Sequence, residues 1–257
     1  MPHTTFPTLS ECALCRSPQE LQQSHLLPNF LFKRLREPTG SFVAASCPDW
    51  PIQRGPIAKM LCFDCEQLFS QWEGNVQRVF YPHDSRPNLP IKYGPWLQLF
   101  ATSISWRALT FLKHSVQNPY ITLSEAAQRL LPSLAPETHE AAEKVRCAWG
   151  RSLEASSAPV SQNDQHLIFL NGKNFPGERS GIVGFTVCHT DGATAVFSQL
   201  GPICILGVIE DHRPNDWKST RVQSLGGKFH VTSQTLPGHF GAWLSSYFST
   251  IREIETL

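Results

Sequence analysis

Apolar residues recur every three or four positions in several segments of the first 155 residues, which is the pattern of helices that bury one face. The clearest case is WLQLFATSISWRALTFLKH at 96–114, which predicts a largely buried helix. Shorter helices are predicted after Pro28 and after Cys65. Pro136 is expected to open a further helix, and TLSE at 122–125 has the form of a capping box that starts another.

From residue 166 onwards the pattern changes to short segments rich in β-branched and aromatic residues, which is typical of strands. Dipeptides such as Asp191-Gly192 and Gly226-Gly227 separate them, and glycine there tolerates the positive φ angle of a tight turn. An antiparallel meander is therefore predicted. Its strands are expected at 166–170, 181–190, 193–200, 203–210, 219–225 and 228–234. The last segment, GHFGAWLSSYFSTIREIETL, predicts an amphipathic terminal helix that covers one face of the sheet.

Together these elements predict an α+β protein of three parts. Residues 1–95 would form an N-terminal domain that holds all the paired cysteines. Residues 96–155 would form a helical segment, and 166–257 a β-rich domain with the C-terminal helix. The polar stretch at 156–165 is the expected connection. A length of 257 residues allows one large domain or two small ones.

Composition and charge narrow the class of protein without identifying a partner. A hydrophobic content of 41% and a charged content of 17% are those of a globular protein. The net charge is +1, so any attraction to nucleic acid must come from a local cluster of Lys and Arg. Neither a secretory signal nor a run of about 18 apolar residues is present, so we expect a cytoplasmic protein without a membrane span.

Four of the eight cysteines form two C-x-x-C pairs, Cys12 with Cys15 and Cys62 with Cys65. In a reducing cytosol such pairs bind metal more often than they form disulfides. A gap of two residues lets both thiolates of a pair reach one ion, and four sulfur ligands make a closed structural zinc site. We therefore predict one zinc ion held by these four residues. The other cysteines are scattered and are expected to be buried apolar side chains.

The residues around these pairs resemble the zinc-stapled HNH endonucleases, which have a ββα-metal, treble-clef fold. The features that carry the resemblance are the first C-x-x-C, SHLLP at 24–28, LCFDCEQLFSQWE at 61–73 and SWR at 105–107. The likeness is closest to bacterial HNH-like proteins with the motifs SH-x-x-P and LC-x-x-CE-x-x-FS-x-x-E. It spans about residues 12–110. The resemblance implies a treble-clef N-terminal domain that hydrolyses nucleic-acid phosphodiester bonds, in DNA rather than RNA.

The resemblance also implies roles for individual residues. His25 would be the general base that takes a proton from water. A divalent cation, Mg²⁺ or Mn²⁺, would be held by the residue before that histidine and by the residue after the last cysteine, here Ser24 and Glu66. Glu73 shares a helix face with Glu66 and would be a second carboxylate ligand. Ser24 stands where the family has an acidic residue or histidine, Glu66 where it has histidine or asparagine, and RGPIAKML at 54–61 occupies the place of the middle element.

Each catalytic candidate also has a structural interpretation. His25 would be a buried histidine bonded to backbone, or a zinc ligand. Glu66 would be favoured by the dipole at a helix start. Glu73 would pair with Arg107 across two packed helices, because a buried arginine needs a partner. On these interpretations the N-terminal domain is a non-catalytic zinc module that binds nucleic acid or protein.

The densest basic cluster lies in FLFKRLR and is formed by Lys33, Arg34 and Arg36. Clustered cations of this kind contact the phosphates of nucleic acids, and this segment is our candidate for such a surface. The alternative is an ordinary solvated helix face. The expected partner is therefore a nucleic acid, with no membrane contact, and a homo-oligomer is compatible with the sequence.

Overall fold

The computed structural model describes the chain in blocks of residues separated by gaps. These blocks are 9–35, 42–44, 47–52, 55–81, 90–114, 134–156, 165–170, 183–212, 214–231 and 234–255. The helix start predicted at 122–125 lies outside the described residues, and so does most of the predicted connection at 156–165.

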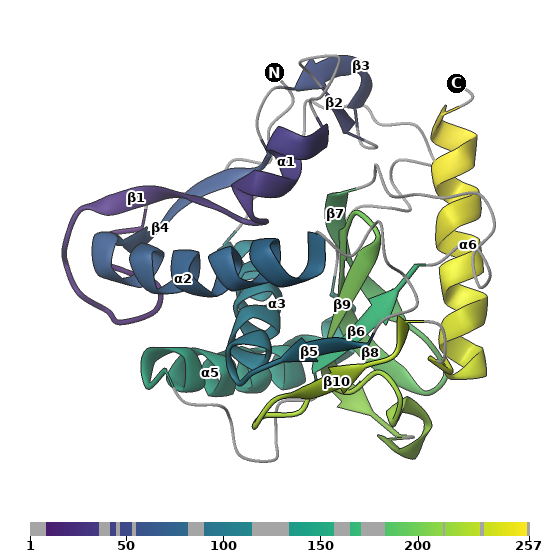
Figure 1. Ribbon diagram of the computed structural model, residues 1–257. Helices are drawn as coiled ribbons and strands as arrows, with labels where there is room; N and C mark the ends of the chain where they lie inside the picture. Colours follow the sequence, from purple (N-terminus) through teal and green to yellow (C-terminus); the bar gives the residue numbers. More distant parts are fainter. Residues whose placement is uncertain are drawn as a thin grey trace.

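The helices and strands follow the chain in the order shown in Figure 1. The helices are α1 (Asn29–Leu35), α2 (Phe63–Phe80), α3 (Trp96–His114), α5 (His139–Glu154) and α6 (Gly238–Glu255). The strands are β1 (Leu21–His25), β2 (Phe42–Ala44), β3 (Cys47–Ile52), β4 (Ile57–Cys62), β5 (Ile91–Tyr93), β6 (Gln165–Phe169), β7 (Val183–His189), β8 (Ala193–Leu200), β9 (Ile203–Asp211) and β10 (Gly227–Phe229). This mixture of helices and antiparallel strands, with a helix near the C-terminus, confirms the predicted α+β class.

A four-stranded antiparallel sheet with the strand order β6-β9-β8-β7 occupies the C-terminal half. β7, β8 and β9 follow one another as the predicted meander, and β6 pairs with the free edge of β9. Every residue of β8 is buried. A strand buried on both faces needs cover on both sides of its sheet.

Alternate side chains of the sheet face two separate hydrophobic clusters. On β6, Leu167 and Phe169 join the cluster that includes α3, whereas Ile168 between them joins the cluster that includes α6. The α6 residues of this second cluster are Phe240, Leu244, Tyr247, Phe248 and Ile251. The sheet therefore lies between α3 and α6 (Figure 1), and the terminal helix covers one of its faces as predicted.

Two segments predicted as strands of this sheet differ from that prediction. The first runs beside β6 at the sheet edge without forming a strand: the amides of Leu167 and Val222 donate hydrogen bonds of 2.9 and 2.8 Å to the carbonyls of Thr220 and Gln165. Residues 219–225 contain only one isolated bridge, between Arg221 and His166. The predicted strand 228–234 is reduced to β10, which pairs with β5 and not with the meander. Gly226 explains the change of direction: its φ angle is 91°, and a Cβ atom there would lie 2.6 Å from the carbonyl oxygen of Tyr93.

Helix α3 is the centre of the core. All its residues from Leu97 to Phe111 are buried, as the apolar pattern predicts. It contacts α2 and α5 as well as β6, β8 and β9, and the Ser105 hydroxyl donates a 2.9 Å hydrogen bond to Gln165. The three predicted domains thus share one hydrophobic cluster through α3, and their division stays a prediction. None of the helices in the described blocks combines the length and hydropathy needed to cross a membrane.

Candidate metal centre

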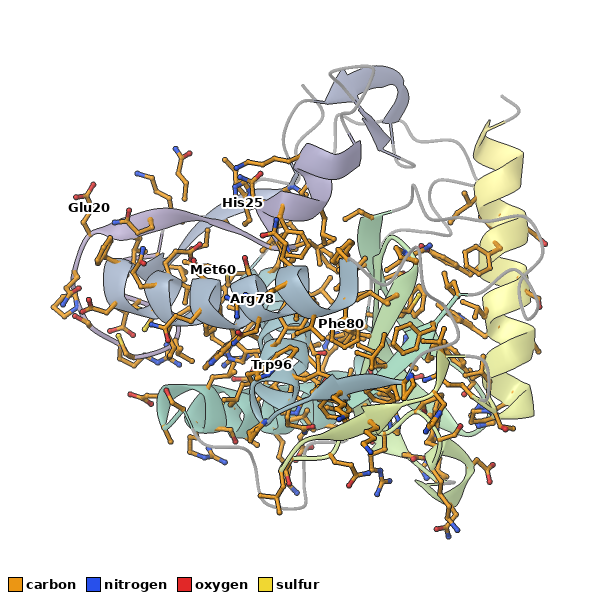
Figure 2. The ribbon with its side chains drawn as sticks, in the orientation of Figure 1. Glu20, His25, Met60, Arg78, Phe80 and Trp96 are labelled. Carbon is orange, nitrogen blue, oxygen red and sulfur yellow. The ribbon has the colours of Figure 1, made fainter. Side chains whose placement is uncertain are left out.

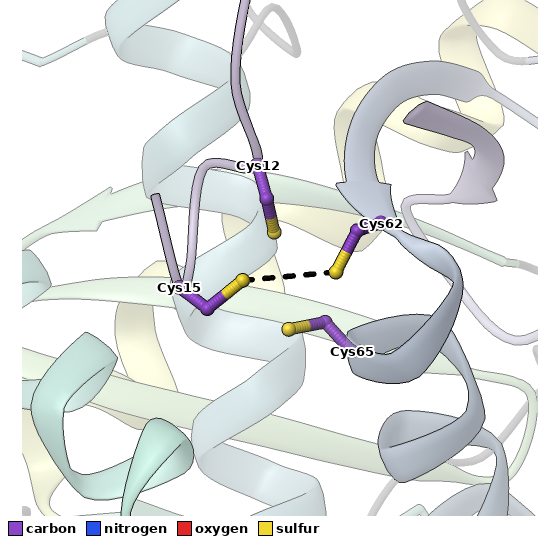
Figure 3. Close-up of side chains that lie close together, drawn as sticks. All are labelled: Cys12, Cys15, Cys62 and Cys65. Atoms are coloured by element: carbon purple, nitrogen blue, oxygen red, sulfur yellow. Dashed lines mark hydrogen bonds between the residues drawn. The ribbon is translucent and has the colours of Figure 1, made fainter. Parts of the chain in front are cut away.

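The ligand atoms of Cys12, Cys15, Cys62 and Cys65 all lie within 4.8 Å of one another (Figure 3). The Sγ atoms of Cys15 and Cys62 are 3.6 Å apart. A tetrahedral zinc site with Zn–S bonds of about 2.3 Å places its sulfur atoms roughly 3.8 Å from each other. The two C-x-x-C pairs therefore converge as predicted, and the four sulfur atoms can hold a structural metal ion such as zinc.

A tight turn positions the first cysteine pair. The amide of Arg16 donates a 3.0 Å hydrogen bond to the carbonyl of Cys12, and the amide of Cys12 donates one of 2.8 Å to Ser17. Arg16 has a φ angle of 61°, in the left-handed region, which lets the chain reverse directly after Cys15. The turn thus points both thiols of the pair to the same side, as Figure 3 shows.

A strand-to-helix junction positions the second pair. Cys62 is the last residue of β4, with extended backbone, and Cys65 lies in the first turn of α2, which begins before the predicted start after Cys65. β4 pairs with β1, so that Cys62 lies opposite Leu21, and the Ala13 amide donates a 2.8 Å hydrogen bond to Met60 on β4. A turn, an antiparallel strand pair and the start of a helix thus bring the two cysteine pairs together.

Hydrogen bonds within the quartet distribute its protons unevenly. The pKa of Cys12 is lowered to about 4, chiefly because the Cys65 thiol donates a hydrogen bond to its thiolate. The same interaction raises the pKa of Cys65, which keeps its proton. A metal ion bound by all four sulfur atoms would displace the remaining protons.

A buried arginine beside this centre engages one of the predicted catalytic carboxylates. The side chain of Arg107 on α3 is 1% exposed, and its Nη2 donates a 2.7 Å hydrogen bond to Oε1 of Glu73 on α2. Its Nη1 donates one of 2.6 Å to the backbone carbonyl of His25. The guanidinium also lies 5.2 Å from the ring centroid of Phe69. The pairing of Glu73 with Arg107, expected from the structural interpretation, is therefore present.

Glu66 lies on the first turn of α2, directly after the candidate metal ligand Cys65. Burial raises the pKa of its carboxyl, Ser24 and Arg107 lower it, and the negative charge of Glu73 raises it further. Ser24 is fully buried and close enough to Glu66 to lower the pKa of its carboxyl. Neither Oγ of Ser24 nor Oε2 of Glu66 is in hydrogen-bonding geometry. The two positions to which the resemblance assigns the cation are thus neighbours. A neutral hydroxyl and a carboxyl whose burial favours protonation are weak ligands for a hydrated Mg²⁺ or Mn²⁺.

His25 is the last residue of β1 and lies opposite Ile57 in the register of β1 and β4. Figure 2 shows it where β1 leads into α1. Its ring is partly buried, with Nδ1 inside the protein, and its backbone carbonyl is fixed by Arg107. Ser24 is the β1 residue whose side chain acts on Glu66. The catalytic role of His25, and those of Glu66 and Glu73, stay predictions.

The basic candidates lie on and after α1. Leu31 and Phe32 are buried and anchor the helix, whereas Lys33 is exposed. The side chain of Arg34 and the whole of Arg36 lie outside the described residues. The structure therefore places one cation of the predicted cluster on the surface, next to an anchored apolar pair.

A buried histidine that sequence reasoning missed lies on β6. His166 is fully buried, its Nδ1 is 3.1 Å from the hydroxyl oxygen of Thr220, and its ring centroid is 4.9 Å from that of Trp217. Burial, with a smaller effect from Arg221, lowers the pKa of His166 to about 3. Its position in an apolar strand was the only signal in the sequence, and that signal does not distinguish a surface histidine from a buried one.

No family model, curated protein sequence or solved structure matches this chain. The likeness to HNH endonucleases therefore rests on the motif residues between 12 and 110. The four cysteine thiols gathered into one metal-binding cluster are the feature of that likeness that the structure bears out.

Proposed function

We propose that the N-terminal part of this chain is a zinc-stapled module that binds nucleic acid without hydrolysing it. The observation that carries the proposal is the cluster of four cysteine thiols within 4.8 Å of one another. Four thiolates complete a tetrahedral shell around zinc and leave no position for water or substrate. Zinc in this site would hold the turn at Cys12–Cys15 against β4 and α2, and would not take part in a reaction.

The proposed binding surface is the basic segment that follows β1. Leu31 and Phe32 fix α1 to the core, so that Lys33 is presented to solvent on an anchored helix. Arg34 and Arg36 follow within three positions and add two further positive charges. Three clustered cations attract a phosphate backbone locally even though the net charge of the chain is only +1. As the resemblance implies, DNA is proposed over RNA.

The test is binding of a fluorescent DNA duplex to the zinc-loaded protein at several salt concentrations. A variant with Lys33→Gln, Arg34→Gln and Arg36→Gln should bind at least about tenfold more weakly and lower the salt slope by about three units. The matched control replaces exposed cations elsewhere, Lys92, Arg151 and Lys218, by Gln and changes the net charge equally. Its affinity should stay within about twofold of wild type. Equal losses of DNA affinity in the two variants, or no DNA binding by the wild type, would refute the proposed surface. An RNA duplex in the same assay tests the preference for DNA.

A second candidate function is an HNH-like endonuclease, favoured by the proximity of Ser24 and Glu66 across β1 and α2. His25 would then take a proton from the attacking water. Plasmid nicking by purified protein with Mg²⁺ or Mn²⁺ decides between the two functions. Nicking by the wild type that is lost in His25→Ala would establish the enzyme. No nicking with either metal, while His25→Ala keeps its zinc and its circular dichroism spectrum, supports the non-hydrolytic module.

A further inference from the structure

Two exposed lysines lie directly opposite each other on the ribbon that β5 and β10 form side by side (Figure 1). Lys92 is paired with Lys228 in the register of the two strands, and both side chains are exposed. Residues paired in this way have Cβ atoms about 5 Å apart, and two like charges there repel each other. Within the blocks that the structure describes, neither lysine side chain makes an ion pair or a hydrogen bond. The outer face of the ribbon therefore carries two positive charges that no counter-charge offsets.

The stretches of chain that supply the ribbon contain no acidic residue. Neither Asp nor Glu occurs at 85–124 or at 217–252. The second stretch adds further cations at Lys218 and Arg221, before β10. Because neither strand has an acidic neighbour along the chain, a bound anionic partner is the natural source of a counter-charge for the lysine pair.

An exposed leucine lies next to the lysine pair. Leu225 is 89% exposed, more than any other large apolar side chain in the described blocks. It comes three residues before Lys228, so their Cα atoms are at most about 11 Å apart. The turn that carries it is fixed, because the amide of Gly226 donates a 3.1 Å hydrogen bond to the carbonyl of Gln223, whose own amide donates one of 3.1 Å to the hydroxyl of Tyr93. A partner can therefore cover this leucine without first ordering the backbone that presents it.

The inner face of the ribbon is anchored to the core. Ile91, Tyr93 and Phe229 are buried in the cluster that includes α3. The rings of Tyr93 and Phe229 stack with their centroids 4.8 Å apart, and Phe229 lies 6.0 Å from the ring of Phe169 on β6. The two lysines are thus presented on strands that the core holds in place.

We propose that the outer face of the ribbon, formed by Lys92, Lys228 and Leu225, docks an acidic segment of a protein partner. Carboxylates of such a segment would neutralise the two lysines, and an apolar side chain beside them would cover the leucine. A nucleic acid also supplies negative charge, but its phosphate backbone offers no apolar surface to the leucine, so a protein is favoured. Docking at this face does not depend on nucleic-acid binding at Lys33.

The test uses a fluorescein-labelled peptide of Glu-Glu-Leu repeats, titrated with the zinc-loaded protein and followed by fluorescence anisotropy. The wild type should bind this peptide at least about fivefold more tightly than a Glu-Glu-Ser peptide of equal charge, because only the first can cover Leu225. Lys92→Gln combined with Lys228→Gln should weaken binding of the Glu-Glu-Leu peptide at least about fivefold, and so should Leu225→Ser. Failure of the wild type to bind, or equal affinities for the two peptides, would overturn the proposal.

Matched controls remove similar side chains from other surfaces. Lys59→Gln combined with Lys144→Gln removes two exposed lysines, and Ile57→Ser removes an apolar side chain that is 39% exposed. Both variants should bind the Glu-Glu-Leu peptide within about twofold of wild type, since charges and contacts far from the ribbon act weakly on it. Losses in these controls equal to those of the ribbon variants would overturn the proposal.

Lys92→Glu separates loss of binding from loss of the fold. It places a carboxylate opposite Lys228, so the urea midpoint should rise while peptide affinity falls at least about tenfold. A lower midpoint together with unchanged peptide affinity would overturn the proposal. A DNA duplex is titrated in parallel. If DNA binding is weakened by Lys92→Gln with Lys228→Gln, and the wild type does not bind the peptide, the ribbon contacts nucleic acid and the proposed protein partner is wrong.

Discussion

Arg107 on α3 and Glu73 on α2 form a hydrogen-bonded ion pair of 2.7 Å in which the arginine is 1% exposed and the glutamate 18% exposed. The pair joins the helix that carries Cys65 to the central helix of the core. A buried pair contributes little over an apolar substitute, but the removal of one partner leaves the other charge desolvated. The loss of either partner is therefore expected to destabilise the contact between the helix that carries Cys65 and the central helix of the core.

Glu73→Gln tests the energetic role of this pair. Gln keeps an oxygen acceptor but removes the negative charge, which leaves the Arg107 cation buried without its hydrogen-bonded counter-charge. We therefore expect the free energy of unfolding to fall by about 3–5 kcal/mol in urea titrations of the zinc-loaded protein. Glu11→Gln is the control, because its partner Arg16 lies 3.4 Å away and both side chains are exposed, at 47% and 61%. That change should cost no more than about 1 kcal/mol. Similar decreases in the free energy of unfolding for both variants would show that burial does not determine how much an ion pair contributes to stability.

The geometry of the four-cysteine cluster predicts which thiols are needed to bind zinc. Cys62→Ser should lower the zinc content of purified protein from one atom per chain to well below one, because a hydroxyl is a poor fourth ligand. Cys147→Ser, at a partly exposed cysteine outside the cluster, should keep one zinc. Elemental analysis after gel filtration measures both. Full zinc content in Cys62→Ser would contradict the assignment.

The contact between α3 and the sheet predicts the effect of a single methyl group. Gly207 on β9 lies against α3, and a Cβ atom there would collide with Ser105 Oγ and come within 2.7 Å of Trp149. Gly207→Ala should therefore lower the free energy of unfolding by about 1–3 kcal/mol. Gly184→Ala on β7 introduces the same group into open space and should change stability by less than about 0.5 kcal/mol. Equal urea midpoints for the two variants would contradict this packing.

His166 predicts a pH dependence of stability. Its pKa is about 3 in the folded protein and about 6.5 when unfolded, so between these values the unfolded chain binds more protons. Stability should thus fall as the pH is lowered from about 6.5 towards 3. Between pH 7 and pH 5 the wild type should lose about 2 kcal/mol more than His166→Phe. Both proteins lose zinc alike in acid, so the difference isolates this histidine, and parallel losses would contradict the prediction.

Local patterns in the sequence predicted the elements but not all of their partners. Apolar spacing gave the helix 96–114, and β-branched residues gave the strand 193–200, with the bounds found in the structure. The strand expected at 228–234 shortened and paired with β5, more than one hundred residues earlier, because glycine at 226 turns the chain towards Tyr93. Periodicity carries no information about such distant pairings.

The candidate metal centre and its surroundings also combine features that the sequence predicted with contacts that it did not. The C-x-x-C spacing was enough to predict the sulfur quartet, since ligand geometry restricts spacing. The partner of Glu73 was foreseen because an arginine in an apolar helix requires a counter-charge. The contact of Arg107 with the His25 carbonyl was not predictable, because it depends on how β1 packs against α3. His166 was missed because an imidazole in a strand gives no sign of its burial.

We propose that one zinc ion is bound by the sulfur atoms of Cys12, Cys15, Cys62 and Cys65. Zinc K-edge X-ray absorption of the purified protein measures the ligand types and distances directly. We expect four sulfur neighbours at about 2.3 Å and no nitrogen or oxygen ligand. A first shell that contains a nitrogen or oxygen atom, or a protein that carries no zinc after expression in zinc-supplemented medium, would contradict it.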